Sequence, residues 1–234
     1  MRHIAKSLVV MGSLLAAGSA SAMFDDISPL IGVDYYHAWT KGKNDYSQVF
    51  PKSYPGFTVY LGAKFCEYWG LELGFDSSGR KKKDFTLASG TSFFNGTTGT
   101  APIVGQTKIR RQGGHLDVIG YLPLVDCLEL TGSLGYGWVK PQITTAVSSQ
   151  AGDGTGSALA TALNSLRGKG KSVFRIGVGL SYMVTDMVGL RAKVGWETTS
   201  SLRVEGNQSF SNLGFSNKGF KSSTTLNVGA FVKF

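Results

Sequence analysis

The carboxyl-terminal segment constrains the fold of this 234-residue chain more than any other feature. Apolar side chains occupy every second position in it, at Leu226, Val228, Ala230, Val232 and Phe234, where the chain ends. The positions between them are mostly polar residues or glycine. Successive side chains of a strand point to opposite faces, so this segment has one apolar and one mostly polar face. The sequence therefore predicts a strand that meets a different environment on each side.

The amino-terminal residues predict export from the cytoplasm. Arg2 and Lys6 flank the start of a short apolar stretch at residues 7–18, and the small residues 20–22 (Ala-Ser-Ala) form a cleavage site. This pattern is typical of a secretory signal peptide and is too short for a membrane span. We therefore expect a signal peptide at residues 1–22 and one mature domain at residues 23–234. No later segment approaches 18 consecutive apolar residues, which excludes helical membrane spans and leaves a soluble exported protein or a membrane β-barrel.

Alternation of apolar residues predicts eight strands. They lie at about 30–41, 56–65, 69–77, 108–122, 127–139, 173–184 and 188–198, with the last strand closing at Phe234. Gly113 and Gly114 predict a bulge in the fourth segment. Short connections at 67–68, 123–126 and 185–187 alternate with long ones at 42–55, 78–107, 140–172 and 199–222. Alternating short turns and long loops are typical of bacterial outer-membrane barrels, whose long loops face outward.

The faces opposite the apolar ones carry charged residues. They include Asp34, Lys64, Glu72, Asp76, Asp117, Glu129, Arg175, Arg191, Lys193, Glu197 and Lys233. The alternation does not show which face lies inside, but the signal peptide and the terminal Phe234 favour apolar faces toward lipid and charges in the lumen. An open sheet would leave unsatisfied backbone groups in lipid. We therefore expect an all-β fold, an eight-stranded antiparallel up-and-down transmembrane β-barrel.

Four segments resemble the OmpA-like superfamily of small outer-membrane β-barrels. They are HLDVIGYLPL (115–124), LELTGSLGYGW (128–138), VGLSYMVTDMVGLRAKVGW (178–196) and LNVGAFVKF (226–234). The resemblance implies the bacterial outer membrane as location, with membrane lipid and lipopolysaccharide as neighbours. It also implies that Phe234 is part of the signal read by the barrel assembly machinery. It does not specify function, because such barrels serve as anchors, adhesins, invasins, small pores and a few enzymes.

The expected interior charges leave two hypotheses open. The lumen of an eight-stranded barrel is just wide enough for side chains to fill, and charges buried there must pair. The pairs form either a polar plug that holds the barrel rigid or a gated ion path. The narrow interior favours the plug.

Catalytic and metal-binding patterns are weak. The two histidines of the mature chain, His37 and His115, lack the His-x-Ser arrangement of lipid A deacylases, and His and Cys residues show no metal-ligand spacing. We therefore expect no enzyme activity, no metal and no cofactor, with a lipid A-modifying enzyme as the last alternative. No basic groove interleaved with aromatic residues is visible, so nucleic-acid binding is not expected.

The cysteines Cys66 and Cys127 both fall at the short-turn end of the predicted barrel. An oxidising compartment favours a disulfide between them. Their strands would lie three strands apart, about 14 Å at about 4.8 Å per strand, whereas a disulfide needs Cα atoms within about 7 Å. Both outcomes stay open.

The long connections are basic, and the chain carries a formal net charge of +9. The clearest candidates for anion binding are Arg80, Lys81, Lys82, Lys83, Arg167, Lys169 and Lys171. We expect residues 80–83 to lie in a mobile loop outside any strand. Helical spacing at residues 157–167 predicts either a small helix over the barrel mouth or a partly ordered segment. The charge predicts a surface scaffold whose loops bind lipopolysaccharide or, like an adhesin, acidic host-surface glycans or proteins. A narrow porin-like channel is the alternative.

Overall fold

The protein is described from a computed structural model that places residues 27–42, 46–90, 92–93, 96–97, 102–147, 160–198, 203–205 and 220–234. The signal peptide predicted at residues 1–22 lies outside these ranges and stays a prediction. Among the described residues, no helix has the length and apolar character needed to cross a membrane.

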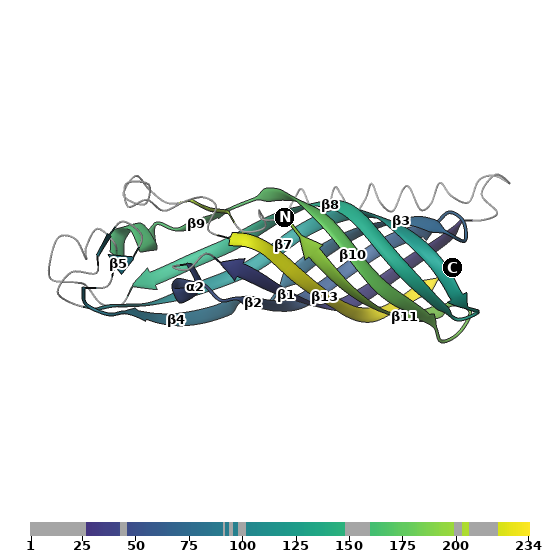
Figure 1. Ribbon diagram of the computed structural model, residues 1–234, viewed down its shortest axis with the longest axis horizontal. Helices are drawn as coiled ribbons and strands as arrows, with labels where there is room; N and C mark the ends of the chain where they lie inside the picture. The colour runs from purple at the N-terminus through teal and green to yellow at the C-terminus, as the bar shows by residue number, and fades with distance from the viewer. Residues whose placement is uncertain are drawn as a thin grey trace.

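Eight antiparallel strands form a closed ring, as the sequence predicts. They are β1 (Ser28–Gly42), β2 (Ser53–Lys64), β3 (Trp69–Ser78), β7 (Ile103–Val125), β8 (Leu128–Val147), β10 (Lys171–Met183), β11 (Val188–Glu197) and β13 (Phe220–Lys233). Each strand pairs with the next along the chain, β13 pairs with β1, and β3 pairs directly with β7. Figure 1 shows the strands crossing the barrel at a steep tilt. The ring therefore has no free edge, which is the condition for a sheet to span lipid.

Three tight connections gather at one end of the barrel, called here the turn end. They span residues 65–68, 126–127 and 184–187. The chain terminus lies at the same end, where the Phe234 N–H donates a hydrogen bond to the Pro29 carbonyl at 2.9 Å. The opposite end is called the loop end.

The apolar faces of the ring strands point outward. Leu134, Val178 and Val194 are each about half exposed, whereas the alternating charged residues are buried. A belt of exposed aliphatic and aromatic side chains around a whole barrel is stable only against lipid. The orientation predicted from the sequence is therefore confirmed.

Beyond the ring, three strands continue past the ends of the others at the loop end (Figure 1). β4 (Lys81–Leu87) pairs with residues 103–109 of β7. It thus takes the place beside β7 that β3 occupies nearer the turn end. β8 follows β7 outward as far as the pairing of Gly105 with Val147. We call residues 81–87, 103–112 and 139–147 the extension. The predicted loops 78–107 and 140–172 are therefore partly sheet.

The placement predicted for the basic run at residues 80–83 is wrong. Lys81, Lys82 and Lys83 are the first residues of β4, and Arg80 lies in the short break between β3 and β4. Alternation does exist here, because Phe85 and Leu87 are buried and Asp84 and Thr86 are exposed. The short apolar pattern was hidden among polar residues and glycines.

The extension has a hydrophobic core of its own. The buried cluster contains Ile103, Ile109 and Ile143 from the sheet, with residues of β1 and β2 near the barrel mouth. Two short helices cover it: α2 (Tyr46–Val49), and a helix at residues 160–164 that, with the turn after it, buries Ala162, Leu163 and Leu166. Of the helix predicted at residues 157–167, residues 160–164 are helical and pack over the mouth. The predicted end is wrong, because Arg167 begins β9, and residues 157–159 lie outside the described ranges.

Four short strands complete the described elements. β5 (Ser92–Phe93) pairs with β6 (Gly96–Thr97), and β9 (Arg167–Lys169) pairs with β12 (Arg203–Glu205). The bulge predicted at Gly113 and Gly114 is wrong, since the β7–β8 register runs through both residues without a shift. The irregularity lies between Pro123 and Val125, next to the turn.

Candidate functional site

Alternation along the ring strands brings the predicted interior charges together in the lumen. Arg191 of β11 crosses the barrel to two carboxylates. Its Nε donates to Asp34 of β1 at 3.0 Å, and its Nη1 donates to Glu72 of β3. The guanidinium also lies over the Tyr60 ring, 3.3 Å from the ring centroid. Arg191 thus ties β11 to β1, two strands away, and to β3, which lies on the opposite side of the ring.

A second guanidinium holds the middle of the lumen. Arg175 Nη1 donates to Asp76 Oδ2 at 2.7 Å and lies 3.6 Å from Glu197. The Thr58 hydroxyl donates to the other oxygen of Asp76 at 2.6 Å. His115 Nδ1 lies 3.2 Å from Asp76, so His115 joins the same group. The enclosed carboxylates therefore have positive or hydrogen-bonding partners, as burial requires.

Lys193 links these two groups. Its Nζ lies 3.3 Å from Asp117 and 3.8 Å from Glu72. Asp117 in turn lies 3.8 Å from Arg175 Nε. The charges thus form one connected network along the lumen.

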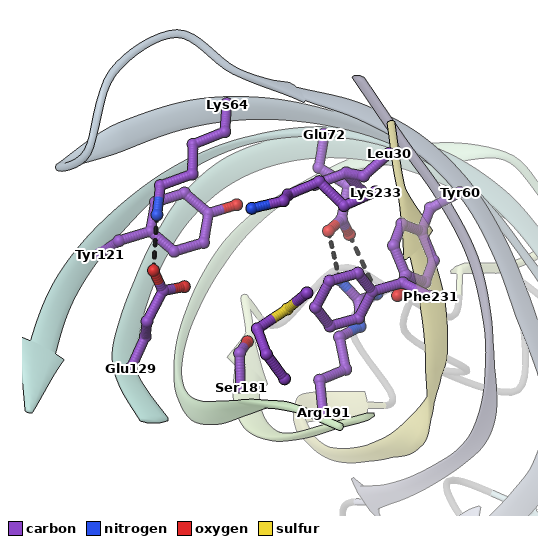
Figure 2. Close-up of a pocket in the computed structure, with 11 residues that line it drawn as sticks. Leu30, Tyr60, Lys64, Glu72, Tyr121, Glu129, Ser181, Arg191, Phe231 and Lys233 are labelled. Atoms are coloured by element: carbon purple, nitrogen blue, oxygen red, sulfur yellow. Dashed lines mark hydrogen bonds and ion pairs between the residues drawn. The ribbon is translucent and has the colours of Figure 1, made fainter. Parts of the chain in front are cut away.

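Nearer the turn end, Lys64 donates to Glu129 at 2.5 Å in a half-buried pair. Figure 2 shows this pair on one side of the cavity at the turn end and the Arg191–Glu72 pair on the other side, where Phe231 and Tyr60 are also drawn. Of the interior charges predicted from the sequence, Lys233 lines the same cavity. The other ten all lie in paired contacts inside the barrel.

The sequence reasoning missed Arg111. Its side chain is almost fully buried and donates to Glu197 at the loop end of the network. Arg111 also lies over the Tyr36 ring, 5.7 Å from the ring centroid. The signal was present, because residue 111 has the same parity in β7 as the interior residues His115 and Asp117. It was overlooked because the basic residues near position 108 were counted with a loop.

Little space remains between the interior side chains. Three voids that described interior residues line measure about 50, 20 and 10 Å³. A single water needs roughly 10–15 Å³, so the smallest of these voids has room for about one water and the largest for a few. At the loop end the apolar cluster of the extension lies above Arg111. The interior of the described barrel therefore contains paired charges, and apolar residues of the extension cover them at the loop end.

One group of ligand-type residues was missed by the sequence search for metal sites. Glu72, His115 and Asp117, from neighbouring strands, each offer an atom, and these atoms lie within 4.8 Å of one another. The group is already neutralised, since Lys193 approaches both carboxylates and Arg191 donates to Glu72. A divalent cation would have to displace these charges, so the residues do not fit a metal site. The three residues are buried, and the described voids that Glu72 lines measure about 50 and 20 Å³.

Both cysteines are free thiols and half-buried at the turn end. Cys66 lies in the connection between β2 and β3, and Cys127 in the connection between β7 and β8. Of the two outcomes left open by the sequence, the structure therefore has the unbonded one.

The basic residues predicted to bind anions are distributed over the loop end. Lys81 and Lys82 are exposed on β4, and Arg80 is exposed just before it. Arg167 and Lys169 lie on β9, and Lys171 is the first residue of β10. Lys83 differs, because its ammonium points inward and donates to the carbonyls of Ser47 and Phe50 in and after α2. Partial burial, and to a lesser degree the charge of Lys52, lowers the pKa of Lys83. Lys83 is therefore a structural tie.

Ion pairs and basic surface are separated in space. The ion pairs of the network and of its turn end all join side chains that point into the barrel. On the flank of the loop end, Arg80, Lys81 and Lys82 are exposed to the surroundings instead. The charged side chains of the network are thus paired, whereas the loop end presents positive charge on its surface.

Comparisons with known proteins agree with this fold. A family model described as the OmpA-like transmembrane domain matches residues 29–223. A major outer membrane protein from Thermus thermophilus has 13% sequence identity and a TM-score of 0.50, over 88% of this chain and 99% of that chain. Ail, the attachment invasion locus protein of Yersinia pestis, solved with the heparin analogue sucrose octasulfate, has 14% identity and a TM-score of 0.49, over 89% and 99%.

The outer membrane protein OprG from Pseudomonas aeruginosa has 12% identity and a TM-score of 0.49, over 89% of this chain and 96% of that chain. At such identities the likeness concerns the fold alone. No curated protein sequence matches the chain significantly.

Proposed function

Because the chain belongs to the OmpA-like transmembrane domain family and lies in the bacterial outer membrane, we propose that it is a surface scaffold whose basic loop-end residues bind lipopolysaccharide. The observation that carries the proposal is the separation of charge described above. Paired charges fill the lumen, whereas exposed cations such as Arg80, Lys82 and Lys171 gather at one end. Lipopolysaccharide is anionic and is adjacent to that end when the long loops face outward. Long-range attraction between the two needs no shaped pocket.

The filled lumen favours the scaffold over the narrow channel. An ion would have to pass the network from Arg191 to Arg111 and then the apolar cluster above it. Each step would require breaking buried ion pairs, which is costly. Planar-bilayer recording of the purified barrel should show no stable conductance steps. Regular steps would support the channel instead.

The proposal includes no enzyme activity. His115 is enclosed among carboxylates and has no cavity for a lipid beside it within the described part of the barrel. Expression of the protein should leave the mass of lipid A unchanged. A shift by an acyl chain would support the lipid-modifying alternative.

The binding test is salt titration with matched variants. Arg80, Lys81 and Lys82 are replaced together by Gln, and Lys83 is kept because it holds α2. We expect binding of lipopolysaccharide to weaken above about 0.15 M salt, where the screening length is near 8 Å, and to weaken further in the triple variant. Lys233→Gln, which removes a positive charge at the turn end, should leave binding unchanged.

Two results would contradict the proposal. Salt-independent binding would exclude long-range attraction. An equal loss in Lys233→Gln would show that net charge alone matters. A parallel titration with a sulfated glycan and host cells separates a lipopolysaccharide collar from adhesion, because an adhesin would bind the host ligand in preference.

Assembly is a second part of the proposal. Phe234 ends an alternating strand, and its N–H is bonded to Pro29 of the neighbouring strand β1. We expect the barrel assembly machinery to read this terminus. Deleting Phe234 should slow the appearance of the heat-modifiable folded form while export continues. Unchanged closure kinetics would remove Phe234 from that role.

A further inference from the structure

A groove lies on the outward face of the barrel, where β3 gives way to β4. Its volume is about 650 Å³, and it is open to the surroundings. Tyr35 and Phe57 line it from β1 and β2, and Arg80 and Arg110 line it from the β3–β4 break and from β7. The groove is separate from the lumen, because residues 35, 57 and 110 have the outward parity of their strands.

The groove exists because the sheet is interrupted there. β3 ends at Ser78 and β4 begins at Lys81, so Gly79 and Arg80 have no partners in β7. The Gly79 N–H instead donates to the Pro55 carbonyl at 2.8 Å. A Cβ at Gly79 would meet only that carbonyl, at 3.7 Å, so no side chain fills the space. The groove therefore results from the backbone path between β3 and β4.

Two guanidinium groups are held at the groove. Arg110 Nη2 donates to the Ser77 hydroxyl at 3.1 Å, which lays its side chain across the end of β3 and leaves other N–H groups for a ligand. Arg80 is exposed beside it. Guanidinium groups suit phosphate because they donate two parallel hydrogen bonds.

Further cations lie on the same outward face. Lys82 and Lys108 are directly opposite each other in the β4–β7 register, two positions from Arg80 and Arg110 respectively. Like charges directly opposite on a sheet repel. The carboxylate of this face within the described residues, Asp84, accepts a hydrogen bond from Gln106 at 2.7 Å. Four cations are thus gathered where an anion would relieve their repulsion.

The groove also lies at the edge of the apolar belt. Tyr35 and Phe57, both about half exposed, belong to the belt that meets lipid. On β7 the outward face changes from apolar at Leu116 to basic at Arg110. An occupant would therefore contact apolar rings on one side and guanidinium groups on the other. That combination fits an amphiphile with a phosphate headgroup.

We propose that this groove binds the phosphate end of an outer-leaflet lipid, the lipid A portion of lipopolysaccharide. The phosphate lies between Arg80 and Arg110, with Lys82 and Lys108 nearby, and acyl chains pass over Tyr35 and Phe57 into the membrane. The inference rests on the proposed function, since it gives the basic loop end a defined lipid site. It goes further by placing binding on the flank of the barrel rather than on the loop tips.

The test compares groove variants with a matched control in the purified full barrel. The probes are lipid A, dephosphorylated lipid A and inorganic phosphate. Arg80→Gln with Arg110→Gln removes two cations from the groove, and Arg167→Gln with Lys169→Gln removes two exposed cations from β9, away from the groove. We expect lipid A binding to weaken about tenfold for each arginine removed from the groove, and by a smaller factor in the control, whose two cations contribute long-range attraction alone.

Two further variants test the shape of the site. Gly79→Leu places a side chain in the groove without removing charge, and should also weaken lipid A binding. Arg110→Lys keeps the charge but cannot donate two parallel hydrogen bonds, so it should bind lipid A more tightly than Arg110→Gln and less tightly than wild type.

The other probes test the role of the phosphate group. Dephosphorylated lipid A should bind weakly to wild type, and its binding should not change in Arg80→Gln. Inorganic phosphate alone should bind weakly, since it lacks the apolar contacts. Heat-modifiable gel mobility confirms that each variant is closed.

The outcomes separate this inference from the proposed function. If the groove variant and the control weaken lipid A binding equally, the proposal that basic loop-end residues bind lipopolysaccharide stands, and the groove is excluded as the binding site. If wild type does not bind lipid A at all, both fail. If Gly79→Leu binds as wild type does, or if the phosphate group makes no difference, the groove is not the binding site.

Discussion

The membrane-spanning part of the barrel and the extension are built from the same strands, with opposite faces. In the spanning part of β7, His115 and Asp117 point inward and Leu116 points outward. In the extension of the same strand, Ile109 is fully buried inside and Lys108 lies outside. β8 changes in the same way. The two-residue period of inward and outward side chains continues from one region to the other, so the two regions differ in side-chain chemistry and not in strand geometry.

The difference teaches that the surrounding solvent decides which face is apolar. Where lipid surrounds the sheet, the outside is apolar and the inside must be filled with paired charges. Where water surrounds it, the inside is an ordinary hydrophobic core. Arg111 and Glu197 mark the boundary, since their buried pair is the last of the network below the apolar cluster.

The largest effect should come from breaking the pair at this boundary. Glu197→Gln leaves the Arg111 guanidinium buried without its carboxylate and should lower the unfolding free energy by about 3–5 kcal/mol. Replacing both residues by apolar ones of similar volume should cost far less. Urea unfolding in lipid vesicles measures both. A double variant as unstable as the single one would show that packing, not charge, dominates there.

A charge placed on the outward face should have an effect that depends on its position along β8. Leu134→Arg lies in the lipid-facing belt and should cost about 2–4 kcal/mol. Gln142→Arg, on the same face of the same strand but in the extension, should cost less than about 0.5 kcal/mol. The same unfolding measurement applies. Equal costs at the two positions would erase the distinction between the two regions.

A cavity in the extension should affect only that region. Leu163→Ala removes a buried side chain that covers the apolar cluster and should cost about 2 kcal/mol locally, at the low end for such changes because the helix at 160–164 is short and can shift. Hydrogen exchange should speed up at residues 103–109 and stay slow in β10 and β11. Faster exchange throughout the ring would mean that the two regions unfold together.

Most of the ring was predictable from the sequence, and the reason is physical. A strand that faces lipid on one side carries an apolar residue at every second position over a long stretch, as in the strand that ends at Phe234. Few other folds produce this pattern. The extension was not predictable in the same way. Its apolar residues are fewer and face inward, and residues such as Lys81 and Lys82 made β4 look like a solvated loop.

The candidate sites were predictable by residue but not by pairing. Parity placed Asp76, Glu197 and Arg175 in the lumen, but which carboxylate meets which guanidinium depends on the stagger of the strands around the ring. The group of Glu72, His115 and Asp117 was missed because its members come from two strands. The groove near Arg110 could not be foreseen, since it depends on where β3 stops.

The most direct test of the inverted faces is a cysteine scan along β7 with two fluorescence quenchers. After Cys66 and Cys127 are replaced by Ser, single cysteines at 118, 116, 110 and 108 sample the outward face, and 117 and 109 sample the inward face. We expect a lipid-soluble quencher to reach 118 and 116, a water-soluble quencher to reach 110 and 108, and neither to reach 117 or 109. Lipid quenching at 109 or 117, or one uniform response along the outward positions, would contradict the inversion.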